Sequence, residues 1–240
     1  MKTAKLFDYQ IFNSSTDDAL DVALKLMDGS RVAQIVTINP EMINLSFKDG
    51  NFASLLNEAD LLLPDGVGIK LAQMIMGEKS SRIPGIDFSY KLLQACEKSD
   101  ATVAFIGTTK EILDKAVNNI KTKMPDLKIV YTHDGFFESN ETIYEELKTV
   151  APDLVLVALG SPKQEYFIHG AKRILKTGLM IGVGGSFDVW SGVVKRAPKI
   201  YQKLGLEWLY RTISQPERFK RIFPALPLFL LKVLKSRLGV

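Results

Sequence analysis

Two segments of the chain carry side chains that could do acid–base or phosphate chemistry. Asp65 follows the apolar run 61–63 and precedes a glycine, so a partly desolvated carboxylate there could act as a general base. Pro-Asp-Gly is also a common turn sequence, which leaves a purely structural role open for Asp65. Lys163 and Gln164 follow the apolar run 153–160, and a cation beside an amide could bind a phosphate or a sugar.

The second of these segments also has the pattern of a helix start. Ser161 is suited to the N-cap and Pro162 to the first helical position, and Gln164 or Glu165 could close back on the cap. This pattern accounts for the serine, the proline and one acid. It does not account for a lysine and a glutamine side by side at the end of a strand.

Other loops supply weaker signals for phosphate binding. Gly184, Gly185 and Ser186 follow an apolar run, where glycine backbone can approach a phosphate closely or can simply form a tight turn. Arg82 precedes Pro84 on a loop, where a guanidinium can hold a diphosphate or can point into solvent. Both interpretations stay open for both loops.

Several familiar motifs are absent from the sequence. It contains neither the GxGxxG fingerprint of dinucleotide-binding proteins nor the GxxxxGK[ST] phosphate loop, and the Gly-x-Ser-x-Gly of common hydrolases is missing too. An Asp-x-Asp clamp for a metal-bound nucleotide sugar is also missing. His133 and His169 have no Cys or carboxylate at metal-ligand spacing, so we expect no metal site.

The elements that must position these residues alternate along the chain. Short apolar runs rich in β-branched residues are typical of strands buried on both faces, and amphipathic stretches such as 110–123 and 141–150 lie between them. The predicted strands are 32–38, 61–63, 102–107, 127–131, 153–160 and 178–183. This pattern predicts an α/β fold, a Rossmann-like, mostly parallel sheet flanked by helices. Ligands of such sheets bind beyond the carboxyl ends of the strands, where the residues above lie.

Composition limits the class of protein. With 240 residues, 46% of them hydrophobic, the chain is an ordinary globular protein rather than a disordered or collagen-like one. The single cysteine, Cys96, gives no internal disulfide, and we find neither a signal peptide nor a membrane span. We therefore expect a cytoplasmic protein.

Charge is distributed unevenly and suggests a division of the chain. Residues 192–240 carry eleven Lys or Arg against two Glu, a net charge of +9, so the rest of the chain contributes −5 to the overall +4. We predict a catalytic domain at 1–191 and a basic helical C-terminal appendage at 192–240, with helix breaks near Pro216 and Pro224. The last helix could lie in a membrane interface or pack on the body of the protein or on another subunit.

Taken together and in order, these segments resemble the WecG/TagA/CpsF glycosyltransferase family (glycosyltransferase family 26), with the TagA-type enzymes most similar. The resemblance runs from about Val32 to Arg221. Its motifs are 37–41, 60–68, 82–87, 160–165 and 182–188, with 207–211 and 216–221 in the basic tail. Linked motifs in a fixed order are far more specific than any one of them.

The resemblance implies an inverting transfer of N-acetylmannosamine from UDP-ManNAc. The implied acceptor is the 4-hydroxyl of GlcNAc on undecaprenyl diphosphate, and the product is a β-1,4-linked disaccharide lipid of wall teichoic acid synthesis. Relatives use other donors, such as UDP-ManNAcA, in capsule and other surface polysaccharides, which leaves the donor sugar open.

The resemblance also assigns roles to residues. Asp65 corresponds to the proposed base, and Thr37 with Asn39 would contact the donor sugar. Residues expected to take part in catalysis are Asp65, Thr37, Arg82, Arg211, Arg218 and Arg221. Residues expected to bind substrate are Asn39, Gln164, Lys163, Gly160, Gly184, Gly185 and Asp188. The three tail arginines are expected to fold over the site and approach the diphosphate.

Expected partners follow from these roles. They are a UDP-sugar donor, the undecaprenyl-diphosphate-linked GlcNAc acceptor, an anionic membrane surface on the inner face of the bacterial cell membrane and further copies of the chain. We expect no cofactor, no metal and no nucleic acid. The competing hypothesis is a nucleotide-sugar or polyphosphate binding module without transfer activity, which would not depend on Asp65. A Rossmann-type oxidoreductase lacks its fingerprint.

Overall fold

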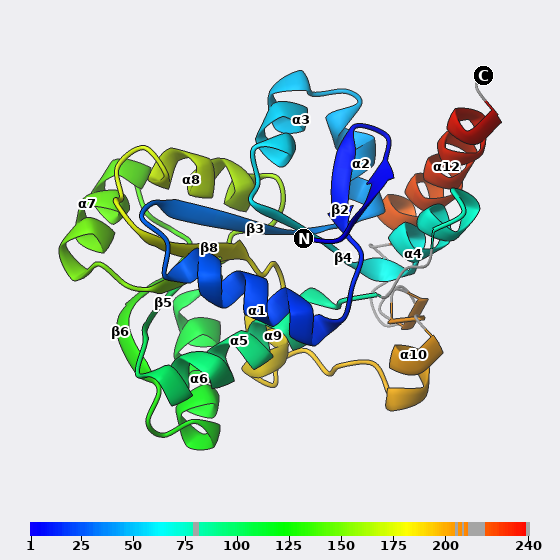
Figure 1. Ribbon diagram of the computed structural model, residues 1–240. Coiled ribbons are helices and arrows are strands. Elements are labelled where there is room, and N and C mark those ends of the chain that lie inside the picture. The colour runs from blue at the N-terminus through cyan, green and yellow to red at the C-terminus, as the bar shows by residue number, and fades with distance from the viewer. Residues whose placement is uncertain (79–81, 205, 208, 211–218, 239–240) are drawn as a thin grey trace.

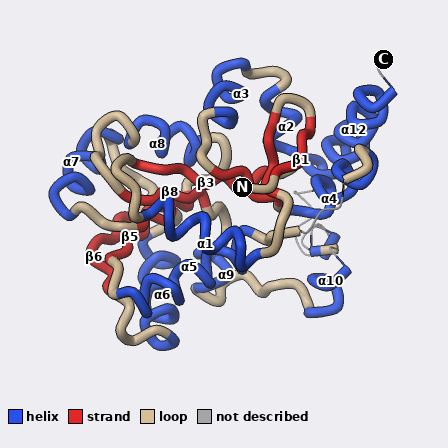
Figure 2. The backbone as a smooth tube through the Cα atoms, viewed as in Figure 1, coloured by secondary structure: helices blue, strands red, loops and turns tan. Residues whose placement is uncertain are grey.

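The computed structural model describes the chain except residues 79–81, 205, 208, 211–218 and 239–240, and describes 203–204 and 219–224 by their backbone alone. Within these residues eight strands form one sheet in the order β1-β2-β4-β3-β8-β7-β5-β6. The strands are β1 (Thr3–Leu6), β2 (Tyr9–Phe12), β3 (Val32–Ile38), β4 (Leu61–Pro64), β5 (Thr102–Gly107), β6 (Lys128–His133), β7 (Leu154–Ala158) and β8 (Gly178–Gly182). Apart from the antiparallel β1–β2 pair, all neighbouring strands are parallel. Figure 2 shows the strands in red. The predicted Rossmann-like α/β fold is confirmed.

Helices cover both faces of this sheet (Figure 1). Their bounds are α1 (Thr16–Met27), α2 (Pro40–Ser46), α3 (Gly50–Asn57), α4 (Gly66–Ile75), α5 (Gly85–Ser99), α6 (Lys110–Lys123), α7 (Asn140–Val150), α8 (Lys163–Ala171), α9 (Ser186–Trp190), α10 (Lys199–Leu204) and α12 (Phe219–Leu238). One face packs against α1, α5, α6 and α9. The other packs against α2, α3, α4 and α12 around β2, β3 and β4, and against α7 and α8 around β5, β7 and β8.

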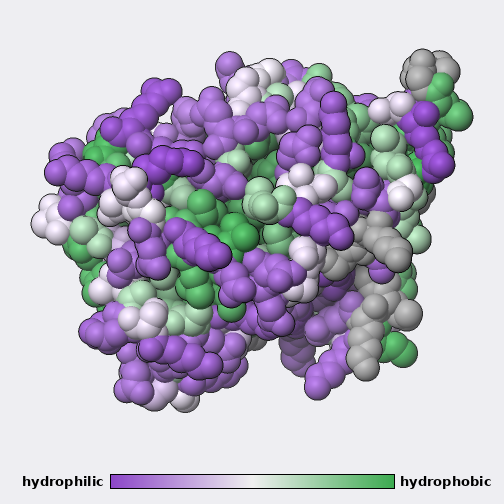
Figure 3. Space-filling model, in the orientation of Figure 1, coloured by the Kyte–Doolittle hydropathy of each residue, from purple (hydrophilic) through white to green (hydrophobic). Residues whose placement is uncertain are grey.

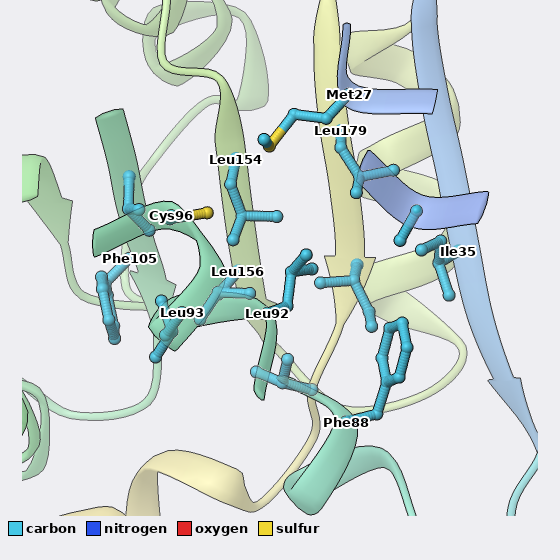
Figure 4. Packing of buried hydrophobic residues seen from close by; sticks show 14 of the residues in the cluster. Met27, Ile35, Phe88, Leu92, Leu93, Cys96, Phe105, Leu154, Leu156 and Leu179 are labelled. Atoms are coloured by element: carbon cyan, nitrogen blue, oxygen red, sulfur yellow. The ribbon is translucent and has the colours of Figure 1, made fainter. Parts of the chain in front are cut away.

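The central strands are buried on both faces, which explains their continuous apolar sequences. In β3, Ala33 and Ile35 point into the core beneath α1 and α5, whereas Val36 and Ile38 point into the core beneath α2 and α4. Figure 4 shows the first of these cores, where Phe88 of α5 meets side chains from the strands. Each face therefore needs its own apolar residues.

The N-terminal hairpin of β1 and β2 was not predicted. Each strand has only four residues, and the outward-facing Lys5 and Gln10 pair with each other at exposed positions. Runs this short give too little alternation to be recognised in the sequence. The hairpin joins the parallel sheet through Ile11, which pairs with Leu62 of β4.

The predicted helix break near Pro224 is wrong, because α12 continues through that residue. Pro216, the other predicted break, lies outside the described residues. An interior proline removes a backbone hydrogen bond. In α12 this loss is offset because Phe229 and Val233, both fully buried, pack against α2 and α4. The division of the chain at residue 191 stays a prediction.

Among the described residues, no helix combines the length and apolar character needed to cross a membrane.

Candidate active site

One cleft of about 570 Å³ lies at the carboxyl ends of the central parallel strands. Segments that follow β3, β4, β5, β7 and β8 all contribute to its lining. Chain order and spatial order diverge here, because β4 lies beside β3 at one side of the sheet whereas β5, the next strand, lies beyond β8 and β7. Such a divergence opens a crevice between the loops, where ligands of open α/β sheets bind.

The cleft gathers most of the residues predicted from the sequence. Those that line it are Thr37, Asn39, Asp65, Arg82, Gly160, Gln164, Gly184, Gly185 and Asp188. Lys163 is exposed and borders a second cavity of about 550 Å³, which shares Thr108, Ala158 and Leu159 with the cleft. Arg211 and Arg218 lie outside the described residues, and so does the side chain of Arg221.

Asp65 occupies the N-cap position of α4 without capping the helix. Its backbone N–H donates to the carbonyl of Ile38 at 3.0 Å, which ties the end of β4 to β3. Its side chain makes no cap hydrogen bond to α4. Burial raises the pKa of Asp65, and the N–H groups of Gly85 and Gly66 lower it by less. A carboxylate that is desolvated and free of the helix cap is suited to accept a proton.

Thr37 and Asn39 border the cleft at the end of β3. Thr37 packs closely on Gly85, where an added Cβ would lie 3.0 Å from the threonine Cγ2 and 3.1 Å from its Oγ1. The amide oxygen of Asn39 accepts the N–H groups of Glu41 at 2.9 Å and Met42 at 3.1 Å, and so caps α2. Because this cap uses the oxygen, the Asn39 side chain has its amide N–H groups to offer a ligand.

The predicted cap at Ser161 is wrong. The N-cap of α8 is Pro162, no side chain makes a cap hydrogen bond there, and the helix begins at Lys163. Gln164 turns instead toward β8, where its amide oxygen accepts the backbone N–H of Gly184 at 3.1 Å. The amide lies so close to Gly182 that an added Cβ would be 2.3 Å from its Nε2. Gln164 therefore packs against the strand instead of closing the helix end.

Arg82 belongs to a network of ion pairs that no local sequence pattern indicated. Its Nη2 donates to Glu207 Oε2 at 3.2 Å and to the carbonyl of Gln202 at 3.1 Å. Arg196 donates to the other Glu207 oxygen at 3.2 Å and grips both oxygens of Asp87 at 2.5 and 2.6 Å. Both contacts of Arg82 and the Arg196–Asp87 pair join residues more than 100 positions apart. They connect the loop before α5 and the first turn of α5 to the segments around α10.

Negative charge prevails in the described lining of the cleft. Arg82 is its one cationic side chain, whereas four carboxylates border the same space: Glu41, Asp65, Asp188 and Glu207. Glu41 and Glu207 were not predicted as cleft residues. A diphosphate bound here would need more positive charge than these residues provide. Among the described residues, no group of three or more His, Cys, Asp or Glu could hold a metal ion.

Comparison with protein families decides the kinship of this chain. The model of the glycosyl transferase WecG/TagA/CpsF family matches residues 4–240. The chain belongs to the WecG/TagA/CpsF family. The match includes the N-terminal hairpin from residue 4 onward and the whole of α12.

Individual members of the WecG/TagA/CpsF family are similar along most of their length. The chain is 34% identical to the N-acetylglucosaminyldiphosphoundecaprenol N-acetyl-β-D-mannosaminyltransferase of Bacillus spizizenii over 210 residues, 87% of this chain and 81% of that one. It is 33% identical to the Bacillus subtilis protein of the same name over 238 residues, 98% and 93% of the two chains. A Staphylococcus aureus protein of that name is 31% identical over 204 residues, 85% and 80% of the two chains.

Proposed function

We propose that this chain transfers N-acetylmannosamine from UDP-ManNAc to the 4-hydroxyl of GlcNAc on undecaprenyl diphosphate, in the synthesis of the wall teichoic acid linkage unit. The names of the relatives support the acceptor and the transferred sugar. The observation that carries the mechanism is Asp65, a carboxylate in the cleft that occupies a helix N-cap without capping it.

In the proposed reaction Asp65 acts as the general base. The carboxylate takes the proton of the acceptor hydroxyl while that oxygen attacks the anomeric carbon of the donor. The bond from the anomeric carbon to the diphosphate breaks on the opposite face, UDP leaves, and the configuration inverts. Burial raises the pKa of Asp65 and so makes its carboxylate a stronger base than an exposed one.

Positive charge must stabilise the departing diphosphate, and the described lining contains too little of it. Four carboxylates share the lining with Arg82, which is already paired with one of them, Glu207. We therefore propose that Arg211, Arg218 and Arg221, from the basic tail, complete the site and take the charge of the leaving group, with no metal ion required. α12 supports this arrangement, since Ala225 and Leu226 near its start line the cleft.

The remaining lining residues would bind the donor. Thr37 and Asn39 lie beside Asp65 at the end of β3 and would contact the sugar. Those assigned to the rest of the donor are Gly160, Gln164, Gly184, Gly185 and Asp188. Lys163 borders the adjoining cavity, where it would reach a part of the donor that extends beyond the cleft.

The outer face of α12 supports a peripheral association with the inner face of the cell membrane. Leu228, Leu231, Leu234 and Leu238 are between 43% and 76% exposed, and Lys235 and Arg237 are interspersed among them. Figure 3 shows apolar and hydrophilic residues side by side on the projecting end of this helix. Basic residues gain roughly 1 kcal/mol each near anionic headgroups, and leucines insert beside them. Vesicle sedimentation should show binding to anionic vesicles; sedimentation velocity would show whether this face pairs copies of the chain instead.

The experiment for this proposal is a product assay on the full chain. A soluble GlcNAc-diphosphate lipid analogue is offered with UDP-ManNAc, UDP-GlcNAc and UDP-ManNAcA in parallel, with anionic vesicles present and with and without EDTA. We expect UDP release and a disaccharide lipid only with UDP-ManNAc, unaffected by EDTA. Transfer from another donor would overturn the proposed donor but keep the reaction. No transfer from any donor would favour a binding module without catalysis.

A further inference from the structure

Glu165 is a buried carboxylate that neither the helix cap nor the cleft explains. Glu165 is only 2% exposed and is not among the residues that line the cleft. Desolvation of a carboxylate is costly, and burial raises the pKa of Glu165 accordingly. The sequence pattern assigned this acid to the start of α8, where no side-chain cap exists. A carboxyl group kept at this buried position calls for another role.

One hydrogen bond of the carboxylate comes from a residue of the cleft. The Nε2 of Gln164 donates to Glu165 Oε1 at 2.8 Å, while the Oε1 of Gln164 accepts the backbone N–H of Gly184 at 3.1 Å. An ionised carboxylate can only accept a hydrogen bond and a backbone N–H can only donate one. Both partners therefore require the same orientation of the Gln164 amide, and a flipped amide would lose both bonds.

The surroundings leave this amide little room. Gln164 is 5% exposed, and an added Cβ at Gly182 would lie 2.3 Å from its Nε2 and 2.7 Å from its Cδ. Gly184, held by the amide oxygen, adopts a φ of +48°, in the left-handed region that favours glycine. The chain of contacts therefore runs from the buried carboxylate through the amide to a glycine turn that borders the cleft.

We propose that Glu165 is a positioning residue for sugar transfer, which fixes the amide of Gln164 in one orientation and through it the turn at Gly184. This inference rests on the proposed function, in which Gln164 and Gly184 bind the donor. The Nε2 and the Oε1 of the Gln164 amide each keep one further hydrogen-bonding position. With the orientation fixed, these positions present a donor and an acceptor to the ligand in a defined order.

The test combines Glu165→Gln with Gln164→Ala in a double-mutant cycle. Glu165→Gln keeps the shape but removes the charge that selects the amide orientation, so we expect KM for the UDP-sugar to rise about tenfold with a smaller change in kcat. In the Gln164→Ala background the same change should alter KM by less than about twofold, because Glu165 then has no amide to orient. Glu58→Gln is the matched control, since the Glu58 carboxylate is exposed and pairs with His169 of α8. The KM of this variant should equal that of the wild type.

Amide hydrogen exchange supplies a readout that is independent of turnover. We expect Glu165→Gln to speed exchange of the Gly184 N–H while the rest of the sheet stays protected. Glu165→Asp keeps the carboxyl group but shortens the side chain by one methylene, which withdraws the hydrogen-bond acceptor. It should also speed exchange of the Gly184 N–H. Faster exchange throughout the chain in both variants would overturn the proposal by marking Glu165 as a residue of the fold alone. An unchanged KM, or a rise that persists in Gln164→Ala, would overturn it too, whereas failure of the wild type to transfer sugar would refute only the proposed function.

Discussion

Replacing Phe229 by alanine should undock α12 and open one wall of the cleft. Phe229 is fully buried where α12 packs against α2 and α4, with its ring centroid 6.3 Å from that of Phe7. Truncation of a buried phenylalanine costs about 3–5 kcal/mol. Because α12 is the C-terminal element of the described chain, this cost should appear first as local opening, and each 1.4 kcal/mol is tenfold in the opening equilibrium. We therefore expect amide exchange within α12 to speed up by about a hundredfold or more.

The same variant should impair transfer, since Ala225 and Leu226 of α12 line the cleft. Leu231→Ala is the control, because Leu231 lies on the same helix, is 55% exposed and should cost less than about 0.5 kcal/mol. Hydrogen exchange read by mass spectrometry, together with kcat/KM on the soluble lipid analogue without vesicles, compares the two variants. Equal exchange in α12 for both would refute the docking of this helix through its Phe229 face.

Three further predictions concern the charges around the cleft. Since burial raises the pKa of Asp65 and the base must be ionised, kcat/KM should fall as the pH drops through a pKa above the usual range of a carboxyl group. The residual activity of Asp65→Asn should not show this fall at low pH. An ionised Asp65 costs stability above that raised pKa, so Asp65→Asn should melt at the same or a higher temperature at pH 7, and a clear drop in Tm would contradict the assignment. Arg196→Ala removes the partly buried side chain that bridges Asp87 and Glu207, so it should lower the free energy of unfolding by about 1–2 kcal/mol and Tm by about 2–6 °C. Lys115→Ala, which breaks an exposed ion pair, should leave Tm unchanged. Scanning calorimetry compares the two variants.

Five of the six predicted strands could be recognised in the sequence because burial on both faces leaves a continuous apolar run: β3, β4, β5, β7 and β8. The sixth, β6, lies at the edge of the sheet, and its residues alternate between exposed and half-buried positions. Strand β5 has the predicted bounds, and β6 differs by only one or two residues at each end. The clustering of Thr37, Asp65 and Gly184 follows from the same fact, since parallel strands bring their carboxyl ends to one edge. Local pattern and topology agree here, so the strands and the clustering of these residues could be predicted from the sequence.

The rest depends on contacts between distant residues. Glu207 enters the cleft because it pairs with Arg82, 125 positions away, and nothing in the sequence around either residue records that pair. α12 continues through Pro224 because Phe229 and Val233 are buried on helices from the first third of the chain. In both cases tertiary packing outweighs the local preference.

The most direct test of the account compares wild type and Asp65→Asn with UDP-ManNAc and the GlcNAc-diphosphate lipid analogue. Transfer is measured as β-linked disaccharide lipid by NMR, and donor binding by titration calorimetry. We predict a β-linked product from the wild type, a loss of kcat of about 10² to 10⁴ in the variant, and unchanged affinity for UDP-ManNAc. An α-linked product, or a variant that transfers at the wild-type rate, would contradict the proposed inverting reaction with Asp65 as its base.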